Sequence, residues 1–304
     1  MRMKRTVLFM LSVVVLLFLA GCQGQNANPE GVSAVWFGGD QGLLASYELE
    51  TREIYEDEAF PITVLLENKG EYTIFPHEVE LEIKGISPND FSGVDFLTDN
   101  LDQIERVSEY LPEGGYEIVD FGEALYEGLS GTFYDAEIYV EMTYPYATFV
   151  AIPRVCFKEN FRDKRVCEIE GVREGYASGA PIQSGAVKQR PAGAGQFYLE
   201  IPVVNRGQGR AKAYVNDEFS NLYDEVRFEV NTEGFTCNSR GDPQIVRISR
   251  APGSMNEQVI RCKSDRLEKG ALYTQQVDIT LSYYYQDLMS EVVRIKENPD
   301  LLDY

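Results

Sequence analysis

Apolar and polar residues alternate along most of the chain, and this period of two is typical of β-strands. The alternating segments are rich in Val, Ile, Tyr and Phe, and they are separated by Gly, Asn, Asp and Pro. Because successive strand residues point to opposite faces, we expect sheets with one face on a core and the other in water. The clearest segments are residues 60–67, 78–84, 136–146, 196–205, 225–230 and 275–285.

One segment has a helical period instead. Leu101, Ile104, Val107 and Leu111 recur at helical spacing across residues 98–111, behind polar residues that can cap a helix. We therefore expect a short helix within an otherwise all-β chain.

Two motifs occur twice at nearly the same spacing, which indicates an internal repeat. A strand that ends in Asn-x-Gly at residues 68–70 recurs 137 residues later at 205–207. A strand that ends in Tyr-x-Tyr at residues 144–146 recurs 139 residues later at 283–285. The Asn-x-Gly step suits a sharp turn, because Gly tolerates positive φ and Asn can bond its own backbone.

The repeat predicts an all-β protein of two tandem antiparallel immunoglobulin-like β-sandwiches, since short strands and frequent turns are typical of that architecture. We expect the first sandwich in residues 32–153 and the second in residues 154–304, with the boundary near Pro153. Residues 175–195 are rich in Gly, Ala and Ser, and we expect them to form a long loop.

The strand that leads into each Asn-x-Gly motif, at residues 62–70 and 199–207, resembles a known class of domain. It is similar to the adhesion-related conserved-repeat (CARDB-like) sandwich domains of archaeal and bacterial surface proteins. The resemblance implies an immunoglobulin-like fold and a cell-surface setting, without fixing an activity.

The N-terminus has the features of an export signal. Arg2, Lys4 and Arg5 precede an apolar run over residues 7–20. The run has the length of a signal-peptide h-region. It is too short for a membrane-spanning helix, which needs roughly 20 apolar residues.

The apolar run ends in Leu-Ala-Gly-Cys at residues 19–22, which resembles the lipobox of prokaryotic lipoproteins. The resemblance implies that residues 1–21 are a lipoprotein signal peptide and that Cys22 is acylated. The polar residues 22–31 would then be a flexible tether at the outer face of the cell membrane. The alternatives are a secretory signal with a chance cysteine and a retained signal anchor.

The chain is strongly acidic, with a formal charge of −21. Without the three positive charges of the signal segment, the charge is near −24. Such a surface repels phosphates, and the sequence has no polybasic stretch, so nucleic-acid binding is excluded.

Four cysteines remain if the first is acylated, and an exported chain encounters an oxidising environment. Local pairing predicts disulfides between Cys156 and Cys167 and between Cys237 and Cys262, each worth about 3 kcal/mol in the chain-entropy model. A zinc site is the alternative, but there is no CxxC and His77 is the only histidine.

The sequence has no catalytic motif of the serine hydrolase, zinc protease or nucleotide-binding type. We expect His77 to be a surface histidine at the start of a strand. A pair of carboxylates, as in glycosidases, is the chemistry that 49 acidic residues leave open. We therefore expect a chain without enzymatic activity and without a cofactor.

Two further groups of residues are candidates for binding. Carboxylates at Asp90, Asp95, Asp99 and Asp102 could bind calcium, but their spacing matches no EF-hand, and solvated turns and caps explain them better. Aromatic residues could form a glycan platform, although packing in the sheets explains them better. These are Trp36, Tyr144, Tyr146, Tyr283, Tyr284 and Tyr285.

Together these features predict a non-enzymatic, membrane-anchored surface lipoprotein that acts as an adhesion, scaffold or interaction module, with protein or glycan partners in the cell envelope. One alternative is a solute- or glycan-binding lipoprotein with an aromatic site at the domain junction. A carboxylate-dependent envelope hydrolase is the other.

The anchor and the disulfides predict the intact mass of the membrane-extracted protein. The mass should be that of a chain that begins at Cys22 and carries a lipid. Four alkyl groups should add only after reduction. A mass without lipid, or alkylation of four cysteines without reduction, would contradict the surface-anchor hypothesis.

Overall fold

The alternating segments form β-strands in the computed structural model, and the all-β fold class is confirmed. The described residues form sheets of mostly antiparallel strands that do not close into a barrel, and none of them lies in an α-helix. The predicted signal peptide, Cys22 and the predicted tether lie outside the described residues. The structure describes residues 36–48, 51–126, 128–193, 195–251 and 256–298.

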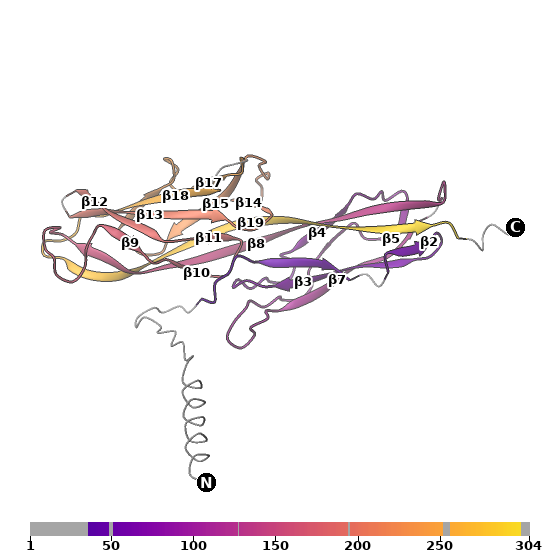
Figure 1. Cartoon of the computed structure of the whole chain (residues 1–304), viewed down its shortest axis with the longest axis horizontal. Coiled ribbons are helices and arrows are strands. Elements are labelled where there is room, and N and C mark those ends of the chain that lie inside the picture. The colour runs from indigo at the N-terminus through magenta and orange to yellow at the C-terminus, as the bar shows by residue number, and fades with distance from the viewer. Residues whose placement is uncertain (1–35, 49–50, 127, 194, 252–255, 299–304) are drawn as a thin grey trace, which may run out of the picture. The chain divides into compact units, whose positions relative to one another are not determined.

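The described residues all belong to one compact unit, Ala34–Tyr304. They form three sheets (Figure 1). The four-stranded sheet has the order β1 (Leu43–Tyr47), β3 (Phe60–Asn68), β7 (Tyr116–Tyr126) and β5 (Phe91–Val94). The six-stranded sheet has the order β16 (Phe235–Asn238), β18 (Glu257–Ser264), β13 (Gln196–Asn205), β12 (Val187–Gly193) and β9 (Gly171–Arg173), and β11 (Ile182–Ser184) pairs with β13.

The third sheet is nine-stranded, and two long strands lie at its centre. Its order is β17 (Ile245–Ser249), β15 (Tyr223–Val230), β19 (Leu272–Lys296), β8 (Phe133–Lys158), β4 (Glu80–Lys84) and β6 (Leu97–Asp99). In addition, β10 (Tyr176–Ala177) pairs with β8, whereas β14 (Arg210–Lys212) and β2 (Glu53–Tyr55) pair with β19.

The long strands β8 and β19 belong to two sandwiches. Near the start of β8, the Ile138 carbonyl accepts the Tyr47 hydroxyl of β1 at 3.0 Å. Past the middle of β8, the Thr148 hydroxyl donates to the Ile182 carbonyl of β11 at 2.6 Å. The four-stranded sheet therefore covers one part of the long pair and the six-stranded sheet covers the other.

We call the four-stranded sheet, with the parts of β8 and β19 opposite it and β2, β4 and β6, the N-terminal sandwich. The C-terminal sandwich is the six-stranded sheet with the remaining parts of β8 and β19 and with β10, β14, β15 and β17. The predicted boundary residue, Pro153, lies inside β8 and not in a linker. Residues 32–153 and 154–304 thus each contribute to both sandwiches, because β8 and β19 pair from Phe133–Lys296 to Leu272–Lys158.

The two repeats meet at the middle of this long pair. Pro145 of β8 pairs with Tyr284 of β19, and these two residues are equivalent at the repeat offset of 139. An antiparallel pair of equivalent residues has a local two-fold relation. Tyr144 consequently pairs with Tyr285, and Tyr146 with Tyr283.

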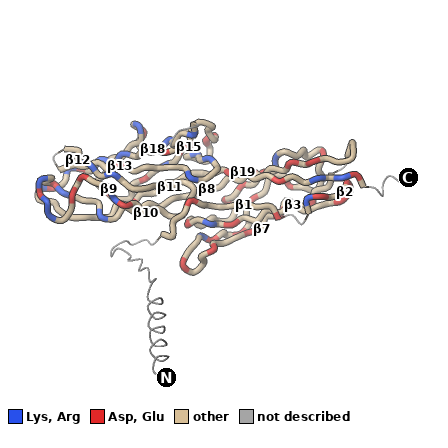
Figure 2. Tube along the Cα trace, in the orientation of Figure 1, with Lys and Arg blue, Asp and Glu red and all other residues tan. Residues whose placement is uncertain are grey.

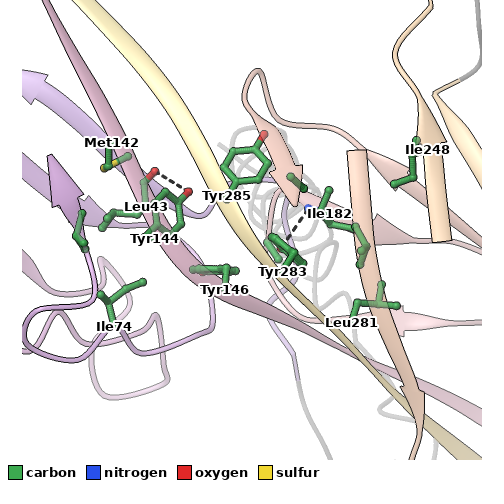
Figure 3. Close-up of a cluster of buried hydrophobic side chains, with 14 of the residues drawn as sticks. Leu43, Ile74, Met142, Tyr144, Tyr146, Ile182, Ile248, Leu281, Tyr283 and Tyr285 are labelled. Atoms are coloured by element: carbon green, nitrogen blue, oxygen red, sulfur yellow. Dashed lines mark hydrogen bonds between the residues drawn. The ribbon is translucent and has the colours of Figure 1, made fainter. Parts of the chain in front are cut away.

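The four paired tyrosines are buried between the two sandwiches (Figure 3). Neighbouring ring centroids lie 5.8 to 6.2 Å apart, in tilted and T-shaped arrangements that favour aromatic pairs. Burial raises the pKa of all four hydroxyls above the ordinary value, so they remain protonated in the neutral range. Each hydroxyl has a hydrogen-bond partner, as buried polar groups require.

The Asn-x-Gly turns provide some of these partners. Tyr146 donates to the Asn68 side-chain oxygen at 3.4 Å, and Tyr285 donates to that of Asn205 at 3.3 Å. The same oxygens accept the N–H of Gly70 and Gly207, at 3.2 and 3.0 Å. Each repeat therefore connects its early turn to its late tyrosine motif in the same way.

Two local expectations are wrong. Residues 98–111 form no helix: they contain β6 and extended segments, and Leu101, which a helix would bury, is 68% exposed. The side chain of Asn100 instead accepts the N–H of Val79 and donates to the carbonyls of Phe75 and Asp102, which fixes an extended path. Residues 175–195 are not one long loop either, because β10, β11 and β12 lie there.

The close approach of the tyrosines to the turns predicts a large effect of Gly207→Ala. A Cβ at this position would collide with the Tyr285 hydroxyl and lie 2.9 Å from Pro181 Cβ. We expect the free energy of unfolding to fall by about 2 kcal/mol, the typical cost of overpacking, in urea titrations followed by circular dichroism.

Gly185→Ala is the matched control, since its nearest neighbour, Pro202 Cγ, would lie at an ordinary 3.8 Å. This control should change stability by no more than about 0.5 kcal/mol. Equal stabilities of the two variants would contradict the proposed close packing of the joint.

Candidate functional site

A groove of about 750 Å³ lies on the outer face of the nine-stranded sheet, over the pair at which the two repeats meet. Its floor contains Thr143, Pro145 and Tyr284, which alternate with the buried tyrosines along β8 and β19. Because adjacent strand residues point to opposite faces, the motif that buries Tyr283 and Tyr285 must turn Tyr284 outward. The same six-residue joint thus forms a core on one face and a groove floor on the other.

The two walls of the groove come from different sandwiches. On the N-terminal sandwich, the wall consists of His77, Glu78, Glu80, Leu97, Thr98 and Asp99. On the C-terminal sandwich, it consists of Lys212 and Val215. Leu97 and Val215 are 61% and 58% exposed, so each wall presents an apolar side chain beside its charges.

The charged groups of the groove differ in how far they are neutralised. His77 Nδ1 lies 2.9 Å from Asp99 Oδ2. Glu78 accepts the N–H of Phe75 at 2.9 Å, and no described Lys, Arg or His forms an ion pair with it. No ion pair or side-chain hydrogen bond joins Glu80 to another described residue.

The cation of the opposite wall is held by its neighbours. Lys212 Nζ donates to the Val215 carbonyl at 2.9 Å and lies 4.7 Å from the centroid of the Phe219 ring. It lies 5.9 Å from the centroid of the Tyr284 ring. Cation–π contact of this kind favours the charged ammonium at the edge of the groove floor.

Of the six aromatic candidates, Tyr284 alone reaches this groove. Tyr144, Tyr146, Tyr283 and Tyr285 are at most 2% exposed and belong to the core. Trp36 stacks on the Phe149 ring, with centroids 5.6 Å apart, and lines a separate hollow of about 300 Å³ with Phe37 and Tyr110.

The four calcium candidates are not brought together as a site. Asp99 pairs with His77, and the backbone N–H groups of Asp90 and Asp95 donate to the carbonyls of Ser87 and Phe121. The Asp102 carbonyl accepts a bond from Asn100, as part of the extended path described above. Among the described residues, no three His, Cys, Asp or Glu side chains are placed to hold a metal ion.

Both expected disulfides are present in the C-terminal half of the sequence. Cys156 at the end of β8 is joined to Cys167, and Cys237 of β16 is joined to its cross-strand partner Cys262 of β18. Each closes a local segment, as the pairing of sequence neighbours predicts. Neither bond lies at the groove.

Two acidic residues that matter for the joint were not singled out by the sequence. Glu71 is 4% exposed, and its carboxylate accepts the N–H groups of Phe37, Gly38 and Gly179 at 2.9, 3.0 and 2.6 Å. It therefore connects the turn after β3 to the loop after β10. No local pattern distinguishes it from the many exposed glutamates.

The second is Asp287, which pairs with Met142 on the core side of β19. It lines a small cavity of about 110 Å³ together with apolar side chains such as Leu44 and Val140. Burial raises the pKa of the Asp287 carboxyl, and the N–H of Leu288, at 2.9 Å, offsets part of this effect. Strict alternation along β19 would have identified it as a core-facing charge.

No family model matches the chain, and the search of curated proteins found no match. Within the described part of the chain, no helix is long and apolar enough to span a membrane.

The raised pKa of Asp287 predicts that Asp287→Asn is stabilising at pH 7. The folded state holds the Asp287 proton more tightly than the unfolded state does, so ionisation of this group costs stability once the pH exceeds the folded pKa. Asparagine removes that cost. The gain should shrink as the pH falls toward about 3.9, the ordinary aspartate pKa.

Urea titrations of the variant and the wild type at both pH values measure the difference. A gain that is the same at neutral and acidic pH, or a loss at pH 7, would contradict this electrostatic explanation.

Proposed function

We propose that this chain is a non-enzymatic surface lipoprotein, held at the outer face of the cell membrane through Cys22, that acts as an adhesion, scaffold or interaction module. The export signal with its lipobox-like end supports the anchor. The two disulfides suit an oxidising compartment outside the cytoplasm.

The observation that carries the proposal is the groove over the joint between the sandwiches. Its floor and its two walls come from both repeats, so it exists only when both are assembled. Its floor strands are fixed from behind by the buried tyrosines and their hydrogen bonds. A concave surface on a rigid support is suited to binding, because little ordering is needed when a partner docks.

The chemistry of the groove favours binding over catalysis. His77 and Asp99 form a pair in which Nδ1 is engaged, but no described serine, threonine or cysteine is hydrogen-bonded to the other ring nitrogen. A nucleophile in a triad would have to lie within hydrogen-bond reach of that nitrogen.

A glycan ligand is the second candidate, and the half-buried ring of Tyr284 beside Pro145 is the observation that favours it. Aromatic faces on a groove floor can stack on sugar rings, while the neighbouring carboxylates accept hydrogen bonds from sugar hydroxyls.

A photo-cross-linking amino acid tests the groove as an interaction surface. In cells of the organism that encodes the protein, Tyr284 is replaced by p-benzoylphenylalanine. We expect light to join the chain to an envelope component at this position. The same residue at Tyr116, which is 70% exposed on β7, is the matched control and should not give that product.

Absence of any adduct at position 284, or the same adducts at positions 284 and 116, would contradict the groove as the interaction surface. An adduct that resists protease and is removed by glycosidases would favour the glycan alternative.

A further inference from the structure

Charge is divided very unevenly between the two halves of the sequence. Residues 32–153 contain 26 Asp and Glu against 4 Lys and Arg, whereas residues 154–304 contain 22 against 21. Figure 2 shows the consequence, with most Lys and Arg on the C-terminal sandwich. The N-terminal sandwich therefore has a negative field of its own, which extends over about 8 Å at physiological salt.

Several carboxylates on the outer face of the nine-stranded sheet in the N-terminal sandwich have a cation beside them. Glu141 pairs with Lys84 at 2.6 Å, and Asp135 pairs with Arg294 at 2.7 Å. Lys84 also lies 3.2 Å from Glu82, so it serves two carboxylates. Glu137 accepts the Tyr139 hydroxyl and forms no ion pair with a described residue, so this face keeps part of its negative charge.

The wall of the groove is different. Glu80 lies on β4 opposite Thr143 of β8, and no cation compensates it within the described residues. Glu78, two positions earlier, accepts the N–H of Phe75 and forms no ion pair with a described residue. Two carboxylates that form no ion pair with a described residue therefore lie side by side where the surface is concave.

The opposite wall does not reverse this preference. The ammonium of Lys212 donates to the Val215 carbonyl and lies over the Phe219 ring, so one of its three N–H donors is used and its position is fixed. An anionic ligand that reached Lys212 would face Glu78 and Glu80 across the groove. The field of the acidic half would oppose its approach as well.

We propose that the groove binds an extended Lys- or Arg-rich segment of a partner protein, an inference that rests on the proposed function. The cationic head group of such a side chain complements the wall that contains Glu78 and Glu80. Its apolar stem suits the floor of Pro145 and the Tyr284 ring, since long basic side chains bury their methylene groups and cations favour aromatic faces.

The test uses the full-length membrane-extracted protein in detergent and fluorescein-labelled hexalysine as the probe, with fluorescence anisotropy as the readout. Labelled hexaglutamate and cellohexaose are the comparison ligands. Three variants are compared with the wild type. Glu80→Lys changes the acidic wall, Glu123→Lys makes the same charge change on the exposed face of β7, and Lys212→Gln removes the cation of the other wall.

We expect hexalysine to bind and to bind more weakly as salt is added, because the contact is electrostatic. Glu80→Lys should weaken binding about tenfold, and Glu123→Lys should weaken it less than about twofold. Lys212→Gln should strengthen binding, since it removes a like charge. The sign of this last effect separates a cationic ligand from an anionic one.

Four results would overturn the proposal. Equal weakening by Glu80→Lys and Glu123→Lys would mean that hexalysine responds to net charge and not to the groove. Weaker binding of hexalysine to the Lys212→Gln variant, or binding of hexaglutamate that this variant loses, would mean that the groove does not select a cationic ligand. Binding of cellohexaose in place of hexalysine would assign the groove to glycans. If hexalysine fails while the cross-linker at position 284 still gives its adduct, the ligand class is wrong and the proposed function stands.

Discussion

The antiparallel pairing of two tyrosine motifs, one on β8 and one on β19, joins the two sandwiches and positions the groove. It buries four phenol rings, and a buried hydroxyl without a hydrogen-bond partner would lower the free energy of unfolding by about 1–3 kcal/mol. The Asn-x-Gly turns help to prevent that cost, because the side-chain oxygens of Asn68 and Asn205 each accept a hydrogen bond from a tyrosine hydroxyl and another from the glycine N–H of the turn. Glycine is required in each turn because the tyrosine hydroxyl occupies the space of a Cβ.

This joint makes the two sandwiches interdependent. The strands that carry the tyrosines extend beyond them in both directions, so each sandwich contains strand segments from both repeats. A linker between tandem domains usually permits relative motion. Here a continuous ladder of β8 and β19 takes its place, and Glu71 adds hydrogen bonds between the turn after β3 and the loop after β10. The groove floor inherits this rigidity, since it is the reverse face of the joint.

Charge and shape reinforce one another at the groove. On the outer sheet face, Lys84 and Arg294 pair with Glu141 and Asp135, whereas no described cation pairs with Glu80 on the wall of the groove. An exposed carboxylate without a counterion costs little in water, so stability does not require a partner there. The concave surface that results has an acidic wall, an aromatic floor and a held lysine, which is a distinctive combination for a docking partner to recognise.

The all-β class and the repeat can be predicted from the sequence, which also favours local disulfide pairs, because alternation, motif spacing and short loop closures are properties of neighbouring residues. The sequence also required one ring of residues 283–285 to face outward. The tertiary structure was needed to show that β8 continues through Pro153, that residues 98–111 are extended, and that Glu80, Lys212 and Tyr284 line one groove. These features depend on pairings between residues more than 100 positions apart, such as Tyr144 with Tyr285, and no local pattern encodes which distant strand supplies the partner.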